Sequence, residues 1–102
     1  MEDSKYIINV AYNLCNKEKI IILKECLERE HSIIELSKLF SFSYTMTWKC
    51  VNELVILGLL DRHIKKHSIG KTVLVVANRE KIKGVMKNVD ICIDRIVGGI
   101  LN

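Results

Sequence analysis

Several features that would decide the fold class are missing from this 102-residue sequence. Proline is absent, so the breaks between elements must come from glycine, serine and asparagine. The longest uncharged apolar runs, such as LVILGLL, are far shorter than the roughly 20 residues that a membrane span needs. The start, MEDSKY, lacks the basic and apolar segments of a secretory signal. We therefore expect a soluble cytoplasmic protein that makes no contact with membranes.

Patterns that carry catalysis or bind cofactors are also missing. The sequence has no glycine-rich phosphate loop, no paired catalytic carboxylates and no cysteine with an evident base. Its cysteines, Cys15, Cys26, Cys50 and Cys92, form no C-x-x-C pair, which favours buried free thiols over a zinc site or a disulfide framework. We expect no enzyme activity, no cofactor and no metal. Cys15, at a helix junction, is the best candidate for a thiol switch.

One strongly basic segment stands out among the features that are present. Residues 1–61 carry seven basic and nine acidic side chains, whereas residues 62–87 carry eight basic side chains and Glu80 as their single acid. Such a concentration of positive charge indicates a polyanionic partner. A solvated run of charge without a partner is the alternative interpretation.

The first two predicted helices lie within residues 1–29. Asp3 or Ser4 can cap the first helix. The apolar stripe of this helix consists of Tyr6, Ile7, Val10, Ala11 and Leu14. Asn16 can cap the second helix, over about residues 17–29. Its predicted buried side chains are Ile20, Ile21, Leu23 and Leu27.

Two further helices are separated by a short break. Ser32 precedes Glu35 by three residues, the spacing of a capping box, so a third helix is predicted to begin near Ile33. Its inward residues are Ile33, Leu36, Leu39 and Phe40. Ser43 can cap a fourth helix after the break, and Gly58 can end it. The predicted inward residues of the fourth helix are Thr47, Cys50, Val51, Leu54 and Leu57.

After Gly58 the pattern changes from helical to alternating. Residues 59–67 and 71–78 predict two strands joined by a tight turn, in which Gly70 supplies a positive φ. Asn78 can then cap a long final helix. A heptad seam runs along that helix through Ile82, Met86, Val89, Ile93, Ile96 and Ile100. We expect this seam to pair with a second copy, in an interface that includes the first helix; packing against its own domain is the alternative.

The predicted fold class is mainly α with a two-stranded β-hairpin, in the order of a winged helix-turn-helix. The stretch IELSKLFSFS resembles the E-L-small-x-x-L-small-aliphatic-S pattern of winged-helix regulators of the MarR and ArsR type. The stretch LVILGLLDR resembles the L-x-x-x-G-L-[LIV]-x-R ending of the same proteins. Two positions depart from the pattern: Ser41 stands where many relatives have glycine, and Trp48 where they have a small serine or threonine.

This resemblance covers about residues 17–78, and the added terminal helices make the chain most similar to small dimeric archaeal members, including those encoded by archaeal viruses and plasmids. It implies one domain, with an N-terminal helix at residues 1–16, a winged core at 17–78 and a dimerisation helix at 79–102. The implied function is a homodimeric, sequence-specific regulator that binds double-stranded DNA in the cytoplasm, at the nucleoid, or in a host if a virus encodes it. A winged helix used for protein contact, or an architectural protein without base specificity, is the alternative.

The resemblance also implies which side chains meet DNA. The recognition helix would place in the major groove Ser43, Tyr44, Thr45, Trp48, Lys49 and Asn52, of which Lys49 and Asn52 are our first candidates for base reading. The hairpin wing would set against phosphates or the minor groove Arg62, Lys65, Lys66, His67 and Lys71. Two alternatives stay open: a rotated helix would bury Trp48, and His63 with His67 on one strand face would allow a metal site. The sequence does not identify a small-molecule effector.

Overall fold

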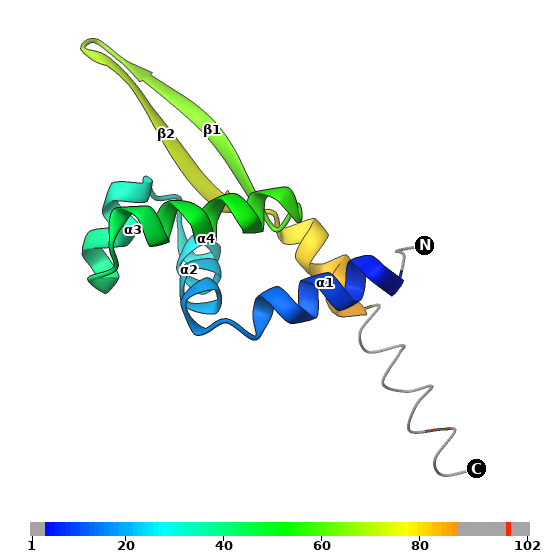
Figure 1. The fold of residues 1–102 in the computed structure, drawn as a ribbon. Coiled ribbons are helices and arrows are strands. Elements are labelled where there is room, and N and C mark those ends of the chain that lie inside the picture. The colour runs from blue at the N-terminus through cyan, green and yellow to red at the C-terminus, as the bar shows by residue number, and fades with distance from the viewer. Residues whose placement is uncertain (1–3, 88–97, 99–102) are drawn as a thin grey trace.

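Side-chain caps set where the helices begin. The computed structural model describes residues 4–87 and 98, and its helices are α1 (Ser4–Leu14), α2 (Lys17–Glu28), α3 (Ile33–Phe40) and α4 (Tyr44–Ile56), followed by a helical segment at residues 79–87 (Figure 1). The Asn16 side chain accepts a hydrogen bond from the Lys19 backbone N–H, and the Ser43 side chain accepts one from that of Met46. Asn78 does the same for Lys81, at 3.0 Å. These three predicted caps therefore each satisfy a free N–H in the first turn of their helices, whereas the cap predicted for the first helix at Asp3 or Ser4 stays a prediction.

The break between α3 and α4 is a tight turn built around one strained residue. At the start of α3, Ser32 and Glu35 form the predicted capping box. At its end, Ser41 adopts the left-handed conformation, with φ +56°, and the Phe42 N–H donates to the Ser37 carbonyl at 2.9 Å. A non-glycine residue pays a steric cost in this conformation. Glycine, which the pattern of the MarR and ArsR type has at this position, adopts the same conformation without that cost.

Exchanging Ser41 for glycine is expected to raise the free energy of unfolding by about 0.5–1 kcal/mol, because the left-handed strain is larger than glycine's extra entropy in the unfolded chain. Gly58, with φ +81°, gives the reverse test. The atoms nearest to a Cβ there belong to the Lys81 side chain, at 3.6 Å or more, so there is room for the methyl group. Gly58→Ala should therefore lower the free energy of unfolding by about 1–2 kcal/mol through backbone strain alone. Urea unfolding followed by circular dichroism measures both. The two substitutions are expected to have effects of opposite sign, and a stabilising Gly58→Ala would contradict the argument from backbone strain.

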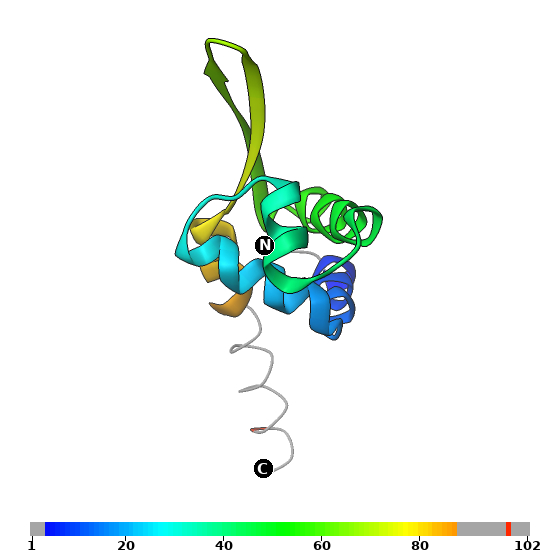
Figure 2. The ribbon, with the colours of Figure 1, turned by 90° about the vertical axis from the view of Figure 1, so that its left-hand side faces the viewer.

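The hairpin projects from the helical body as a long ribbon (Figures 1 and 2). Strands β1 (Leu60–His67) and β2 (Gly70–Ala77) pair antiparallel from Leu60 opposite Ala77 to His67 opposite Gly70. Gly70, with φ +148°, supplies the predicted positive dihedral angle. At the body end, His31 forms a bridge to Val75, with hydrogen bonds of 3.0 and 2.7 Å between their backbones. The ribbon is therefore fixed at its base.

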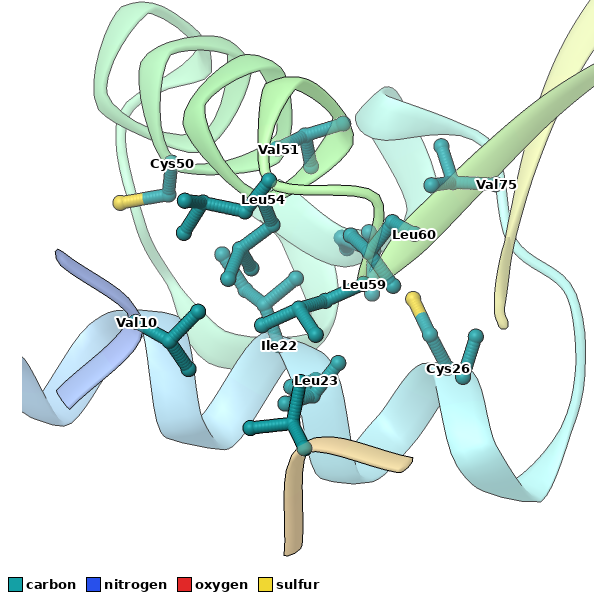
Figure 3. Close-up of a cluster of buried hydrophobic side chains, with 14 residues drawn as sticks. Val10, Ile22, Leu23, Cys26, Cys50, Val51, Leu54, Leu59, Leu60 and Val75 are labelled. Atoms are coloured by element: carbon teal, nitrogen blue, oxygen red, sulfur yellow. The ribbon is translucent and has the colours of Figure 1, made fainter. Parts of the chain in front are cut away.

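The core lies between α4, α2 and the base of the hairpin. In Figure 3 the side chains of Leu54, Leu59 and Ile22 lie between the two helices, with Val10 of α1 at the edge. The inward residues predicted for α4 are all buried: Thr47, Cys50, Val51, Leu54 and Leu57. This face determines how α4 is rotated, and so which side chains it leaves outside.

Other predicted faces need correction. In α2 the buried apolar residues are Ile22, Leu23 and Cys26, whereas the predicted Ile20 is exposed. The prediction was wrong because three isoleucines in succession fit several rotations of the helix equally well. Leu39 of α3 and Ala11 of α1 were also predicted to face inward but are exposed.

Helix α1 and the helical segment at residues 79–87 contact each other near the C-terminus of α4. The Tyr6 hydroxyl donates to the Leu57 carbonyl at 2.6 Å, and the Lys81 ammonium lies 4.6 Å from the centre of the Tyr6 ring. Val85 is buried, and Ile82 packs against the core. The first two turns of the final helix therefore pack against their own domain, as in the alternative to pairing with a second copy. The later seam residues lie outside the described part of the chain: Val89, Ile93, Ile96 and Ile100.

Candidate nucleic-acid interface

The outward side of α4 carries mixed aromatic and polar side chains. Tyr44, Thr45 and Lys49 are exposed, as is Trp48 at 47% of its surface. The interpretation in which a rotated helix buries Trp48 is therefore wrong. Ser43 lies at the helix start, where its hydroxyl serves as the cap. This side offers two aromatic rings, two hydroxyls and an ammonium group, which suit base edges, methyl groups and phosphates.

Asn52 differs from its neighbours on α4 because it already has a partner. Its side chain is half-buried, and its Oδ1 accepts a hydrogen bond from Arg62 Nη2 at 3.0 Å. This hydrogen bond joins α4 to the beginning of strand β1. A two-handed contact with adenine uses both the oxygen and the nitrogen of an asparagine. Asn52 would therefore have to release Arg62 before it could contact adenine in this way. Residue spacing in the sequence does not reveal the hydrogen bond between Asn52 and Arg62.

The basic residues of the hairpin are divided between its two faces. Directly paired residues of an antiparallel ribbon project from the same face. Arg62, Lys66 and Lys71 share the face that meets α4 at Asn52, and Lys66 stands directly opposite Lys71. Lys65 and His67 project from the other face. All five are exposed, and His67 Nε2 lies 2.8 Å from Thr72 Oγ1.

Two histidines contact glutamates near the base of the hairpin. His63 Nε2 lies 2.7 Å from Glu30 Oε2, in the loop before α3. His31 is buried, with Nε2 3.3 Å from Glu25 Oε2 and Nδ1 3.5 Å from Glu35 Oε2. Among the described residues no group of three or more metal-ligating side chains gathers. The contact of His63 with Glu30 joins segments 33 residues apart, so the local sequence pattern gave no signal of it.

Behind α4 lies a cleft of about 560 Å³ between α1, α2 and α4. Lys19 is buried at this cleft, where it pairs with Glu53 and donates to Asn13 Oδ1 at 2.6 Å. Cys15 and Cys50 both line it, but only Cys15 is exposed. Burial raises the pKa of the Cys50 thiol and, together with the charge of Glu25, raises that of Cys26 to about 12. Of the described cysteines, Cys15 is the one open to solvent.

Sequence reasoning also missed several exposed apolar side chains. Ile56 lies on the outward side of α4, at 76% exposure. Ile64 and Val73 face each other across the hairpin, and Ile69 stands at its tip. The sequence did indicate this exposure, because basic residues flank Ile64 along the whole outer part of the strand. Ile8 and Tyr12, one helical turn apart on α1, are exposed as well.

Comparison with known proteins rests on structure. Neither a protein-family model nor a curated protein matches the chain. An ArsR-like transcriptional regulator from a Rhodococcus species superposes with a TM-score of 0.72 at 18% identity, over 94% of this chain and 90% of that one. The fold is that of the ArsR-type winged helix-turn-helix regulators. In these terms α3 and α4 form the helix-turn-helix, and residues 60–77 are the wing.

Two further solved structures are similar to this chain over most of its length. A homodimeric winged helix-turn-helix DNA-binding domain from Mycobacterium bovis, described as a possible ArsR-family transcriptional regulator, has a TM-score of 0.64 at 15% identity, over 92% of this chain and 88% of that one. Reduced HlyU from Vibrio cholerae has a TM-score of 0.64 at 21% identity, over 81% and 84%.

Among the residues that the structure describes, no helix has the length and apolar character needed to cross a membrane.

Proposed function

We propose that the protein is a homodimeric, sequence-specific DNA-binding regulator of transcription, acting in the cytoplasm. The observation that carries the proposal is the outward side of α4, fixed in rotation by its buried face and joined to a basic wing through Arg62 and Asn52. Between Asp61 and Glu80 the sequence contains no acidic residue. The neighbours named as transcriptional regulators support the same function.

The proposed docking follows from the positions of these elements. Figures 1 and 2 show that α4 and the wing lie on the side of the molecule away from α1 and α2. The N-terminal half of α4 would enter the major groove, with Tyr44, Thr45, Trp48 and Lys49 at base edges and backbone. The wing lysines would contact phosphates, which supplies affinity without reading sequence.

The dimer is proposed from a surface that one chain leaves open. Ile8 and Tyr12 stand one helical turn apart on α1 and are exposed, Tyr12 at 79% of its surface. Met86, on the predicted heptad seam, is exposed as well. Exposed apolar side chains that share one face of a helix, as Ile8 and Tyr12 do, are typical of an association surface. The homodimeric neighbour from M. bovis supports pairing, and two-fold symmetry would place two copies of α4 about 34 Å apart, one turn of DNA.

A binding selection over a salt titration tests the proposal. The full chain is incubated with a mixed pool of short duplexes at several salt concentrations, and the bound fraction is sequenced. We expect enrichment of a two-fold symmetric motif and a steep loss of binding with salt. Salt-dependent binding without enrichment would replace the proposal by an architectural role. No binding at the lowest salt would favour a winged helix used for protein contact.

Replacing Asn52 by alanine is expected to reduce discrimination between the selected motif and random DNA by roughly 1–3 kcal/mol. Arg62→Ala and the double variant separate two causes. If Asn52 acts by holding Arg62, the two effects will be non-additive. If it reads a base by itself, they will add. Dissociation constants for both kinds of duplex provide the measurement, and equal losses on the two would exclude Asn52 from base reading.

A further inference from the structure

Ile69 lies in the turn of the hairpin, where the geometry of the turn does not require an isoleucine. Ser68 and Ile69 form the loop between His67 and Gly70, and Ile69 is 96% exposed. Tight hairpin turns favour glycine, asparagine and aspartate, whereas branched apolar side chains have no role in making the turn. Ile69 also makes no contribution to the core. Its side chain is therefore free to act on something outside the molecule.

The surroundings of Ile69 indicate what that partner is. Lys66 and Lys71 stand directly opposite each other beside the tip, and below them Ile64 faces Val73 on the same face. Like charges directly opposite each other destabilise a free hairpin. A partner with negative charges on both sides of an apolar interior would relieve that repulsion and accept the isoleucine at the same time.

Double-stranded DNA offers this combination in its minor groove, where two phosphate backbones flank the stacked base pairs. Proteins that bind there frequently insert apolar side chains, isoleucine among them, between base steps. The hydrogen bond from Arg62 to Asn52 joins this face of the wing to α4. The wing would therefore meet the same duplex as α4, and its tip would reach DNA beside the region that α4 contacts.

We propose that Ile69 is a wedge that enters the minor groove and opens a base step, so that the wing selects DNA by its deformability. This inference rests on the proposed DNA-binding function and adds a specificity determinant to it. Pyrimidine–purine steps such as TA and CA are the easiest to unstack, whereas A-tracts are stiff. We expect the protein to prefer duplexes with a flexible step under the wing and to bend them.

The test uses the duplex enriched by selection, with its flanks changed in turn to every register of a TA step or to an A-tract. Affinity is measured by fluorescence anisotropy, and bending by energy transfer between dyes at the duplex ends. The full chain should bind the best TA flank about tenfold more tightly than the A-tract, with a larger bend. Ile69→Ser should remove both differences, and Ile69→Val should keep most of them. Ile20→Ala, at an exposed isoleucine of α2, is the control that should change neither.

Each outcome bears on one idea. If Ile69→Ser binds and bends every flank as the unchanged chain does, the wedge is overturned while the proposed function stands. If the unchanged chain binds no duplex at low salt, the proposed function itself fails. Vesicles of phosphatidylcholine and phosphatidylserine provide the last arm. Capture by these vesicles that Ile69→Ser abolishes, without any flank preference on DNA, would assign the tip to a membrane surface and overturn the wedge.

Discussion

Replacing Lys66 and Lys71 together by glutamine is expected to weaken binding to all duplexes by roughly 20- to 30-fold at 0.15 M salt, because each phosphate contact contributes about 0.9 to the slope of log affinity against log salt. Both lysines are exposed, lie on the wing face that meets α4 and stand opposite each other. The slope itself should fall by about 1.8. Discrimination between the selected motif and random DNA should change little, since phosphates carry no sequence information.

The matched control is the pair Lys17→Gln and Lys24→Gln. These lysines are exposed on α2, away from the wing, and their replacement changes the net charge by the same amount. Titration at five or six salt concentrations gives the slope for each variant. If the two double variants lose affinity equally, the effect belongs to overall charge, and the wing makes no phosphate contact. An unchanged slope in the wing variant would lead to the same conclusion.

Replacing Leu54 by alanine is expected to lower the free energy of unfolding by about 2–5 kcal/mol, through lost burial and the cavity left behind. Leu54 has no exposed surface and lies between α4 and α2 in Figure 3. Its carbonyl accepts the Leu59 N–H at 3.0 Å where the helix ends. Small domains have only about 5–15 kcal/mol of stability in total. The variant is therefore expected to be partly unfolded at 37 °C.

Ile56→Ala, two residues further along the same helix, provides the control for Leu54. Ile56 is exposed, so its truncation is expected to change stability by no more than about 0.5 kcal/mol. Urea unfolding at one fixed protein concentration compares the two, since dimerisation would make the midpoint depend on concentration. Similar losses in both variants would mean that the rotation of α4 is wrong. Every assignment on its outward side would then have to be revised.

The sequence predicts much of the fold because local chemistry determines it. Caps at Asn16, Ser32, Ser43 and Asn78 appear at their expected places, since each depends on neighbours within one turn. The buried side of α4 was predicted correctly because its apolar residues recur with a single clear helical period. In α2 the consecutive isoleucines carry no such phase, and contacts with distant segments decide which of them is buried.

The candidate site is less predictable because distant segments build it. The exposed residues of α4 and the basic residues of the wing follow from periodicity and charge. The division of the lysines between two faces requires the register of the strands, which the turn sets. The contact of Arg62 with Asn52 joins two successive elements across a turn, and that of His63 with Glu30 joins segments 33 residues apart, so no pattern within a single helix or strand contains them. An archaeal source remains an expectation from the resemblance alone.

The open edge of the wing has a consequence for handling the protein. Within the described residues no strand pairs with the outer edge of β1, and such an edge can recruit the same strand of another molecule. Lysines along an edge oppose this by mutual repulsion and hydration. Lys65 and Lys66 therefore also protect the protein against aggregation, beside the apolar Ile64. Replacing them by alanine or valine would leave a ribbon prone to stack into fibres, so glutamine is the safer neutral substitute in any study of the wing.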